Sequence, residues 1–228
     1  MAILDLKGIR KEYFKGEKKV EALRGVDLAI EKGEFLSVVG PSGSGKTTLL
    51  NIIGCLDAPS SGSVVYGGRE LGKMSEKELS AYRKNNIAFI FQSYNLIPVL
   101  TVAENVELPL VIERKWSRME IVAKTRDVIE AVGLAGMAGR RPRELSGGQE
   151  QRVAIARALV KNPIVVLADE PTANLDSHTA EEIIALMETM NRQRYTTFIF
   201  STHDKRMEDH AKRVILLKDG AIASDERK

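Results

Sequence analysis

Apolar and polar positions follow two alternating patterns along the chain. Short runs that are almost wholly apolar, and rich in β-branched or aromatic residues, occur at 35–39, 87–91, 164–168 and 196–201. Such runs are typical of strands buried on both faces of a sheet. Stretches with helical spacing separate them, at 47–53, 145–160 and 178–193. Strands that alternate with helices predict an α/β fold around a mainly parallel sheet.

Further strands, outside the four apolar runs, are predicted in the first third of the chain and near its C-terminal end. Residues 2–9 and 20–30 indicate two strands, half-buried where apolar and polar residues alternate, with a turn around Gly16 between them. A short strand at 63–66 follows a loop at 57–62. Asp219-Gly220, between the runs 213–218 and 221–224, predicts a hairpin.

Residues 93–145 predict an inserted helical subdomain. Helical spacing recurs at 101–108 and 117–132, and the segment around Trp116 is expected to be their exposed connector. Before the subdomain, a helix at 75–85 begins with Ser75 as cap and Glu78 as its capping-box partner. The second subdomain helix carries an apolar stripe formed by Ile121, Val122, Val128, Ile129 and Val132.

Composition leaves several functions without support. The chain has 228 residues, of which 43% are hydrophobic and 29% charged, as in a soluble α/β domain. Its 34 basic residues nearly balance 31 acidic ones, so charge gives no sign of nucleic-acid binding. The single cysteine, Cys55, excludes an intrachain disulfide and indicates a reducing compartment. We expect neither a signal peptide nor a membrane helix, which needs ~18 apolar residues.

Residues 40–47, Gly-Pro-Ser-Gly-Ser-Gly-Lys-Thr, match the phosphate-binding pattern G-x-x-x-x-G-K-[ST]. Their glycines let successive backbone N–H groups point at phosphate oxygens, and the start of the next helix adds its positive dipole end. Lys46 would supply a cation to the β- and γ-phosphates, and Thr47 a hydroxyl to Mg²⁺. The alternative is a glycine-rich turn that binds nothing, and the order strand, loop, helix argues against it.

Three of the apolar runs are followed by polar residues. Gln92 follows 87–91, Asp169 and Glu170 follow 164–168, and His203 lies just beyond 196–201. Ligands of open parallel sheets bind beyond the carboxyl ends of the strands, so these side chains could converge on one γ-phosphate. Asp169 could hold Mg²⁺, and Glu170 could polarise the attacking water. The alternatives are an acidic strand end that faces solvent and a structural histidine.

Leu-Ser-Gly-Gly-Gln at 145–149 predicts a second anion-binding helix start. On a separate subdomain, it could close over a nucleotide bound to another copy of the chain.

Tyr13 offers two interpretations, because an aromatic before the turn could stack on a nucleotide base or simply end a strand. The apolar run at 96–100, within a loop at 94–100, also offers two interpretations, since the subdomain could bury it or a partner could cover it.

With these motifs the chain resembles the ATP-binding-cassette ATPases, the nucleotide-binding subunits of ABC transporters, over essentially all of its length. The resemblance implies a P-loop NTPase core at 1–92 and 146–228, including an N-terminal antiparallel β subdomain, with the helical subdomain at 93–145. The matching motifs are Walker A at 40–47, the Q-loop at Gln92, the signature at 145–149, Walker B at 164–169 and the D-loop at 174–176.

ATP and Mg²⁺ are the ligands that the resemblance implies. It makes Glu170 and His203 catalytic, and assigns Thr47, Gln92 and Asp169 to the metal. It also favours the base-stacking interpretation of Tyr13. The nucleotide-binding residues that it implies, across an ATP-bound homodimer, are Tyr13, Gly40, Pro41, Ser42, Gly43, Ser44, Gly45, Lys46, Thr47, Thr48, Gln92, Ser146, Gly147, Gly148, Gln149 and Asp176.

Within the family, residues 50–54, 91–98 and 101–106 look like the group for lipoprotein release and macrolide export, which includes cell-division relatives. Members pair with a membrane permease, here expected to be encoded separately, and many transmit force across the membrane. The chain would then lie at the cytoplasmic face of the inner or plasma membrane, with the permease docked near Gln92. Ala173 and Glu150 depart from the residues usual there, glycine and glutamine, without removing a catalytic group. No C-terminal regulatory domain is expected.

Three other functions are weighed against this one. A soluble cassette acting on ribosomes or DNA would usually carry two cassettes or long coiled-coil insertions, and neither is seen here. A kinase or GTPase with a phosphate loop would have no use for the helix start at 145–149. A non-hydrolysing regulatory cassette would lack Glu170 or His203, and both are present. The cargo, its direction, the permease and the preferred nucleobase are not specified by the sequence.

Overall fold

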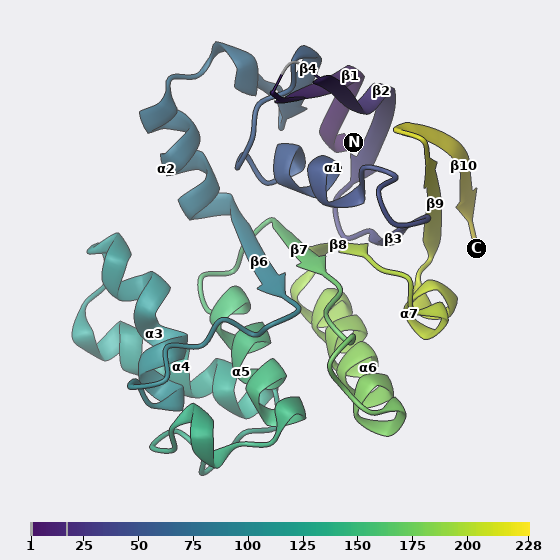
Figure 1. The fold of residues 1–228 in the computed structure, drawn as a ribbon. Helices are drawn as coiled ribbons and strands as arrows, with labels where there is room; N and C mark the ends of the chain where they lie inside the picture. Colours follow the sequence, from purple (N-terminus) through teal and green to yellow (C-terminus); the bar gives the residue numbers. More distant parts are fainter. Residues whose placement is uncertain (1, 17) are drawn as a thin grey trace.

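A six-stranded sheet organises the fold (Figure 1). The computed structural model describes residues 2–16 and 18–228. The strands are β3 (Phe35–Val39), β6 (Ile87–Phe91), β7 (Val165–Asp169), β8 (Thr197–Ser201), β9 (Arg213–Lys218) and β10 (Ala221–Arg227). Their order is β10-β9-β3-β8-β7-β6, and only the β9–β10 pair is antiparallel. The mainly parallel sheet predicted from the apolar runs is therefore confirmed.

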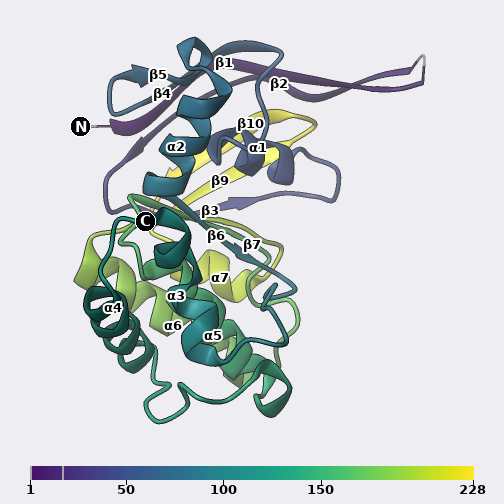
Figure 2. The same ribbon diagram turned by 90° about the vertical axis from the view of Figure 1, so that its left-hand side faces the viewer.

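A second, antiparallel sheet has the order β2-β1-β4-β5, which confirms the expected N-terminal β subdomain. It contains β1 (Ala2–Lys15), β2 (Lys18–Glu31), β4 (Ser61–Tyr66) and β5 (Arg69–Glu70). The first two strands are longer than predicted. Lys11 still pairs with the buried Leu23, but Tyr13 and Phe14 pair with Val20 and Lys19 outside the core, where no apolar alternation is needed. The β1–β2 ribbon extends past the rest of the molecule in Figure 2.

The two faces of the large sheet carry different helices. Leu36, Val38 and Leu167 share one core cluster with α1 (Lys46–Ile53) and the antiparallel sheet. Phe35, Val166 and other alternating strand residues share a second cluster with α5 (Gly147–Leu159) and α6 (Ser177–Arg194). Successive strand residues point to opposite faces. The helices α1 and α5 therefore lie on opposite faces of one sheet (Figures 1 and 2).

The segment predicted as a helical subdomain contains α3 (Val102–Glu113), α4 (Arg118–Ala131) and the 3₁₀ turn η2 (Pro142–Glu144), with α3 and α4 packed on α5. The prediction that the first helix ends at residue 108 is wrong. That helix continues through Pro109 to Glu113, because Val106 and Leu110 are buried in the core on either side of the proline. Val122 is exposed, unlike the rest of its predicted stripe. The subdomain boundaries themselves stay a prediction.

Three short helices complete the fold. The helix α2 (Glu76–Asn86) begins with the predicted Ser75–Glu78 capping box. The turn η1 (Leu71–Lys73) and the helix α7 (Lys205–His210) are too short to leave a periodic pattern in the sequence. Asp219 and Gly220 both have positive φ, at 50° and 79°, as a tight hairpin between β9 and β10 requires. Among the described residues, no helix is long and apolar enough to cross a membrane.

Candidate functional site

The carboxyl ends of the central strands meet along one edge of the sheet. Asp169 is in register with Phe91 on one side and with Ser201 on the other, and Ser201 is in register with Val38 of β3. The segments that begin at Gly40, Gln92, Glu170 and Thr202 therefore leave the sheet side by side. The sequence predicts this convergence, and the register of the strands produces it.

The phosphate loop between β3 and α1 depends on its glycines. Gly40 and Gly45 have positive φ, and a Cβ at these positions would lie only 2.0 Å from the Leu217 carbonyl oxygen and 2.5 Å from the Ala22 carbonyl oxygen. Gly43 also has positive φ but faces open space, so its role is conformational. The Lys46 ammonium folds over the loop and donates to the carbonyl oxygens of Gly40 at 2.7 Å and Pro41 at 3.1 Å.

Hard oxygen donors lie where the sequence predicts a metal. Thr47 Oγ1 is 3.5 Å from Asp169 Oδ2, which joins the first turn of α1 to the end of β7. Gln92 is exposed beside them, at the end of β6. A hydroxyl, one carboxylate and an amide oxygen fit Mg²⁺, which commonly takes one or two carboxylates together with phosphate oxygens and water. The described residues contain no group of three or more acidic, histidine or cysteine side chains that could hold a metal on their own.

Glu170 and His203 form the closest side-chain pair at this edge. Glu170 Oε1 lies 2.7 Å from His203 Nδ1, and the Thr202 hydroxyl donates to the other carboxylate oxygen at 3.4 Å. The Glu170 backbone has φ 48°, and its N–H donates to the Ser201 carbonyl oxygen at 2.8 Å. A glutamate in this left-handed region carries strain of about 1–2 kcal/mol. The contacts with His203 and Thr202 hold its carboxylate at the end of β7.

Several residues that support this pair are not evident from the sequence. Gln151, buried on α5, donates to the Pro171 carbonyl oxygen at 2.6 Å, directly after Glu170. Asn174 Nδ2 donates to the Gln92 carbonyl oxygen at 2.9 Å, and Thr172 Oγ1 donates to an Asp204 carboxylate oxygen at 2.9 Å. These contacts tie the segment after β7 to its neighbours on both sides. They join residues far apart in the chain, so no local pattern announces them.

A helix begins at the predicted second helix start, and its first turn is capped. Ser146 is the N-cap of α5, and it exchanges hydrogen bonds with Gln149 in a capping box. Gly148 allows α5 to approach α6, since a Cβ there would lie 2.4 Å from Thr179 Cγ2. Asp176 caps α6 by accepting hydrogen bonds from His178 and Thr179. Because α5 and α1 lie on opposite faces of the sheet, the structure does not bring Ser146–Gln149 over the phosphate loop of the same chain.

Tyr13 lies on β1 with 40% of its surface exposed. Its hydroxyl donates to Asp57 Oδ2 at 2.7 Å and lies within hydrogen-bonding reach of the Thr48 side chain. Burial and the Asp57 carboxylate raise the pKa of the Tyr13 phenol. The contact with Thr48 places the ring beside the first turn of α1, next to the phosphate loop.

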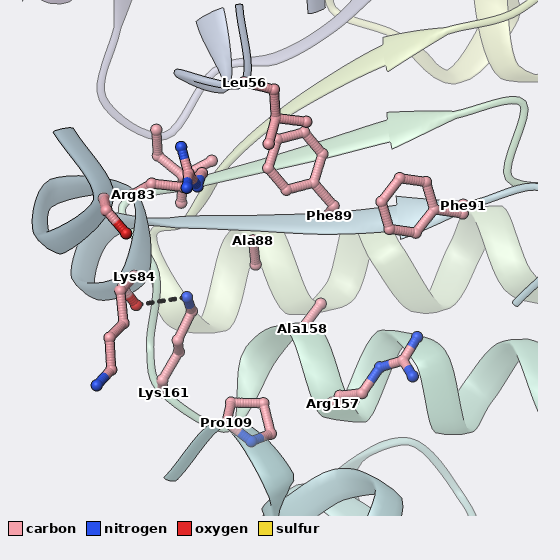
Figure 3. Close-up of a pocket in the computed structure, with 12 residues that line it drawn as sticks. Leu56, Arg83, Lys84, Ala88, Phe89, Phe91, Pro109, Arg157, Ala158 and Lys161 are labelled. Carbon is pink, nitrogen blue, oxygen red and sulfur yellow. Dashed lines mark hydrogen bonds between the residues drawn. The ribbon is translucent and has the colours of Figure 1, made fainter. Parts of the chain in front are cut away.

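A groove lies beside β6, with residues of α2 on one side and residues of α3 and α5 on the other (Figure 3). Leu56, Phe89 and Phe91 form its apolar wall. Four cations also line it, namely Arg83, Lys84, Arg157 and Lys161. All four donate to backbone carbonyl oxygens: Arg83 to Cys55, Lys84 to Ile112, Lys161 to Lys84, and Arg157 to Tyr94 and Asn95. Carbonyl groups satisfy these donors without neutralising their charge.

The apolar run 96–100, which the sequence predicts to be either buried or covered by a partner, is divided in the structure. Leu96 packs against the core and Leu100 is half-buried. Val99 is 73% exposed, and Ile97 is also exposed. Neither interpretation holds for the whole run, because its first and last residues face inward while its middle faces solvent.

Comparison with known proteins gives consistent results over the whole chain. The family model described as ABC transporter matches residues 23–173. The macrolide export ATP-binding/permease protein MacB of Bdellovibrio bacteriovorus is 46% identical over 99% of this chain, which spans only 34% of that protein. The ABC transporter ATP-binding protein MJ0796 of Methanocaldococcus jannaschii is 44% identical over 99% of this chain and 97% of its own length.

Solved structures of MJ0796 have the same fold. One, described as a dimeric bacterial ABC transporter cassette, has a TM-score of 0.89 with 98% of each chain covered. Another, described as a dimeric post-hydrolysis state bound to ADP and Pi, has a TM-score of 0.88 with the same coverage. Both are 44% identical to this chain.

Proposed function

The chain belongs to the ABC transporter family and is an ATP-binding ATPase of that family, and we propose that it works as a homodimer that drives a separate membrane permease. One observation carries the dimer. The two phosphate-binding helix starts, at α1 and α5, lie on opposite faces of one sheet. One chain cannot close both on the same nucleotide, whereas two chains facing each other can. The dimeric structures of MJ0796 support this arrangement.

In this proposal each ATP lies between the phosphate loop of one chain and Ser146–Gln149 of the other. Lys46 leaves its two carbonyl partners to contact the β- and γ-phosphates. Mg²⁺, held by Thr47, Asp169 and Gln92, would neutralise charge on the β- and γ-phosphate oxygens. Glu170 orients and polarises the attacking water, while His203, already 2.7 Å from that carboxylate, contacts the γ-phosphate. Asp176, at the start of α6, would act across the dimer interface.

The transport process that we propose is export or release rather than uptake. The similarity to MacB, named as a macrolide exporter, supports macrolide or peptide export, and the motif pattern supports lipoprotein release as the related alternative. The permease, supplied as a separate chain, would hold this ATPase at the cytoplasmic face of the inner or plasma membrane.

We place the permease contact at the groove beside β6 and the exposed middle of the run 96–100. Phe91 belongs to the groove and directly precedes Gln92, so a segment bound there would contact both the groove and the nucleotide site. Four cations line the groove, and no carboxylate in the described structure lies within salt-bridge distance of Arg83, Lys84, Arg157 or Lys161. This positive charge favours a permease segment that carries acidic residues.

The dependence of ATPase activity on protein concentration tests the dimer. If two chains build each site, the turnover rate per chain rises with chain concentration at saturating ATP until dimerisation is complete. A rate per chain that stays constant over a hundredfold dilution, with the protein monomeric throughout, would contradict the proposal.

A further inference from the structure

A half-buried carboxylate connects β1 to the loop after α1. Asp57 accepts hydrogen bonds from the Tyr13 hydroxyl at 2.7 Å and from the Lys11 ammonium at 2.5 Å. Lys11 also donates to the Ala58 carbonyl oxygen at 2.7 Å, and its Nζ lies 5.0 Å from the centre of the Tyr13 ring. Lys11, Tyr13 and Asp57 form one connected group, which we call the tyrosine anchor.

The members of the tyrosine anchor differ in exposure. The side chains of Lys11 and Asp57 are only 12% and 29% exposed, whereas Tyr13 is 40% exposed. Burial works to raise the pKa of Asp57, but the hydrogen bonds from Lys11 and Tyr13 outweigh it and lower that pKa, so the carboxylate stays charged. A charged acceptor forms stronger hydrogen bonds than a neutral one. The ion pair of Lys11 and Asp57 therefore forms the rigid, less exposed part of the tyrosine anchor, and the ring of Tyr13 forms its exposed part.

Anchoring of the loop alone does not account for the bond to Tyr13. The loop after α1 is already fixed to β1 because Ser60 N–H donates to the Arg10 carbonyl oxygen at 2.8 Å and Ser60 Oγ accepts from Glu12 N–H at 3.0 Å. Lys11 adds an ion pair with Asp57 at the same place. The additional bond from the Tyr13 hydroxyl fixes a side chain on the outside of this connection, beside Thr48 of α1.

We propose that Asp57 is a positioning residue for the nucleotide base. It holds the Tyr13 ring, through its hydroxyl, in the orientation in which a base stacks on it, with Lys11 over the ring and 40% of the residue exposed. The inference rests on the proposed function together with the base-stacking interpretation of Tyr13 that the family resemblance favours. An ordered ring binds more tightly because its rotamer entropy is lost before the nucleotide arrives.

The test compares ATP with inorganic tripolyphosphate, which has the triphosphate but no base. Asp57→Ala should raise the KM for ATP between about two- and tenfold, the range that ordering one side chain supports, with kcat unchanged. The inhibition constant of tripolyphosphate should not change. Tyr13→Phe, which keeps the ring and removes the hydroxyl, should raise the KM similarly, and the double variant should add nothing further. Asp5→Ala, which removes another half-buried carboxylate, on β1 itself, is the matched control.

Two results would overturn the inference. One is an unchanged KM for ATP in Tyr13→Phe, a variant that leaves the Lys11–Asp57 pair intact and so retains the loop anchor. The other is an equal weakening of ATP and tripolyphosphate in Asp57→Ala, which would show that Asp57 acts on the whole phosphate site. Failure of the proposed function looks different, because the turnover rate per chain of the unmodified protein would then not depend on chain concentration.

Discussion

The carboxylate of Glu170 lies 2.7 Å from the imidazole of His203, although the two residues belong to segments that follow different strands. The register of β7 and β8 aligns Asp169 with Ser201, so the next residues of both strands leave the sheet together. A carboxylate and an imidazole in this position can orient a water molecule and contact a phosphate.

We therefore predict that His203→Ala lowers the single-turnover rate of ATP hydrolysis by roughly 100- to 10,000-fold, the usual contribution of a positioned proton-transfer group or its partner. ATP binding should be retained, because the phosphate loop is untouched. His210→Ala is the control, since that imidazole lies at the end of α7 and contacts Glu181 and Glu188 of α6 rather than a residue of the site. Turnover within a factor of two of the unmodified chain would remove His203 from the mechanism.

Lys46→Ala should abolish hydrolysis and weaken ATP binding by on the order of 1.5–3 kcal/mol, the value of a hydrogen bond to a charged group. The fold should survive, because within the described part of the chain Lys46 donates to two carbonyl oxygens, both of its own loop. Equilibrium binding of a fluorescent ATP analogue measures the loss, and the thermal unfolding midpoint checks the fold. Unchanged affinity would mean that the loop does not hold the triphosphate.

The permease contact can be tested with charges placed in the exposed middle of the run 96–100. Ile97→Glu with Val99→Glu should prevent co-purification with an integral membrane protein from cells that express both, while ATPase activity of the isolated chain survives. These positions are preferable to Leu96 and Leu100, whose side chains are partly buried and whose replacement could unfold the segment.

The matched control is Met119→Glu, which charges a side chain that is equally apolar and exposed, but on α4 and outside the groove. The contact lies elsewhere if the control and the double variant keep the membrane protein equally well.

Lys161, in the groove, makes the free energy of unfolding depend on pH in a direction that can be predicted. Burial lowers its pKa from 10.5 to about 8. Between these two values the unfolded chain binds a proton that the folded chain has released, so this group makes the free energy of unfolding rise as the pH increases. Lys161→Met should lose that contribution, and its stability relative to the unmodified chain should decline from pH 8 to pH 10. Urea unfolding at both pH values measures the difference, and parallel changes in the two proteins would contradict the assigned cause.

Sequence patterns predict the elements whose cause is local. The capping box at Ser75, the hairpin at Asp219-Gly220 and the four apolar strands follow from neighbouring residues, and all are present. The length of α3 does not follow, because tertiary burial of Val106 and Leu110 outweighs the effect of Pro109.

The candidate site shows the same division. Lys46 and Asp169 can be found from motifs, since phosphate and metal binding impose a spacing along the chain. Gln151 and Asp57 cannot, because each supports a site residue through a single contact across the fold. The roles of the site residues in binding and catalysis stay predictions until they are measured.

The central claim is that the phosphate loop of one chain and Ser146–Gln149 of another enclose each ATP. Sedimentation of Glu170→Gln at saturating ATP tests it most directly, since this variant keeps the site but cannot polarise water. We predict a stable dimer with ATP, a monomer without it, and a monomer with ATP when Ser146→Arg is added, because the added side chain would block the helix start. A Glu170→Gln variant that binds ATP but remains monomeric, or a dimer that tolerates Ser146→Arg, would contradict the account.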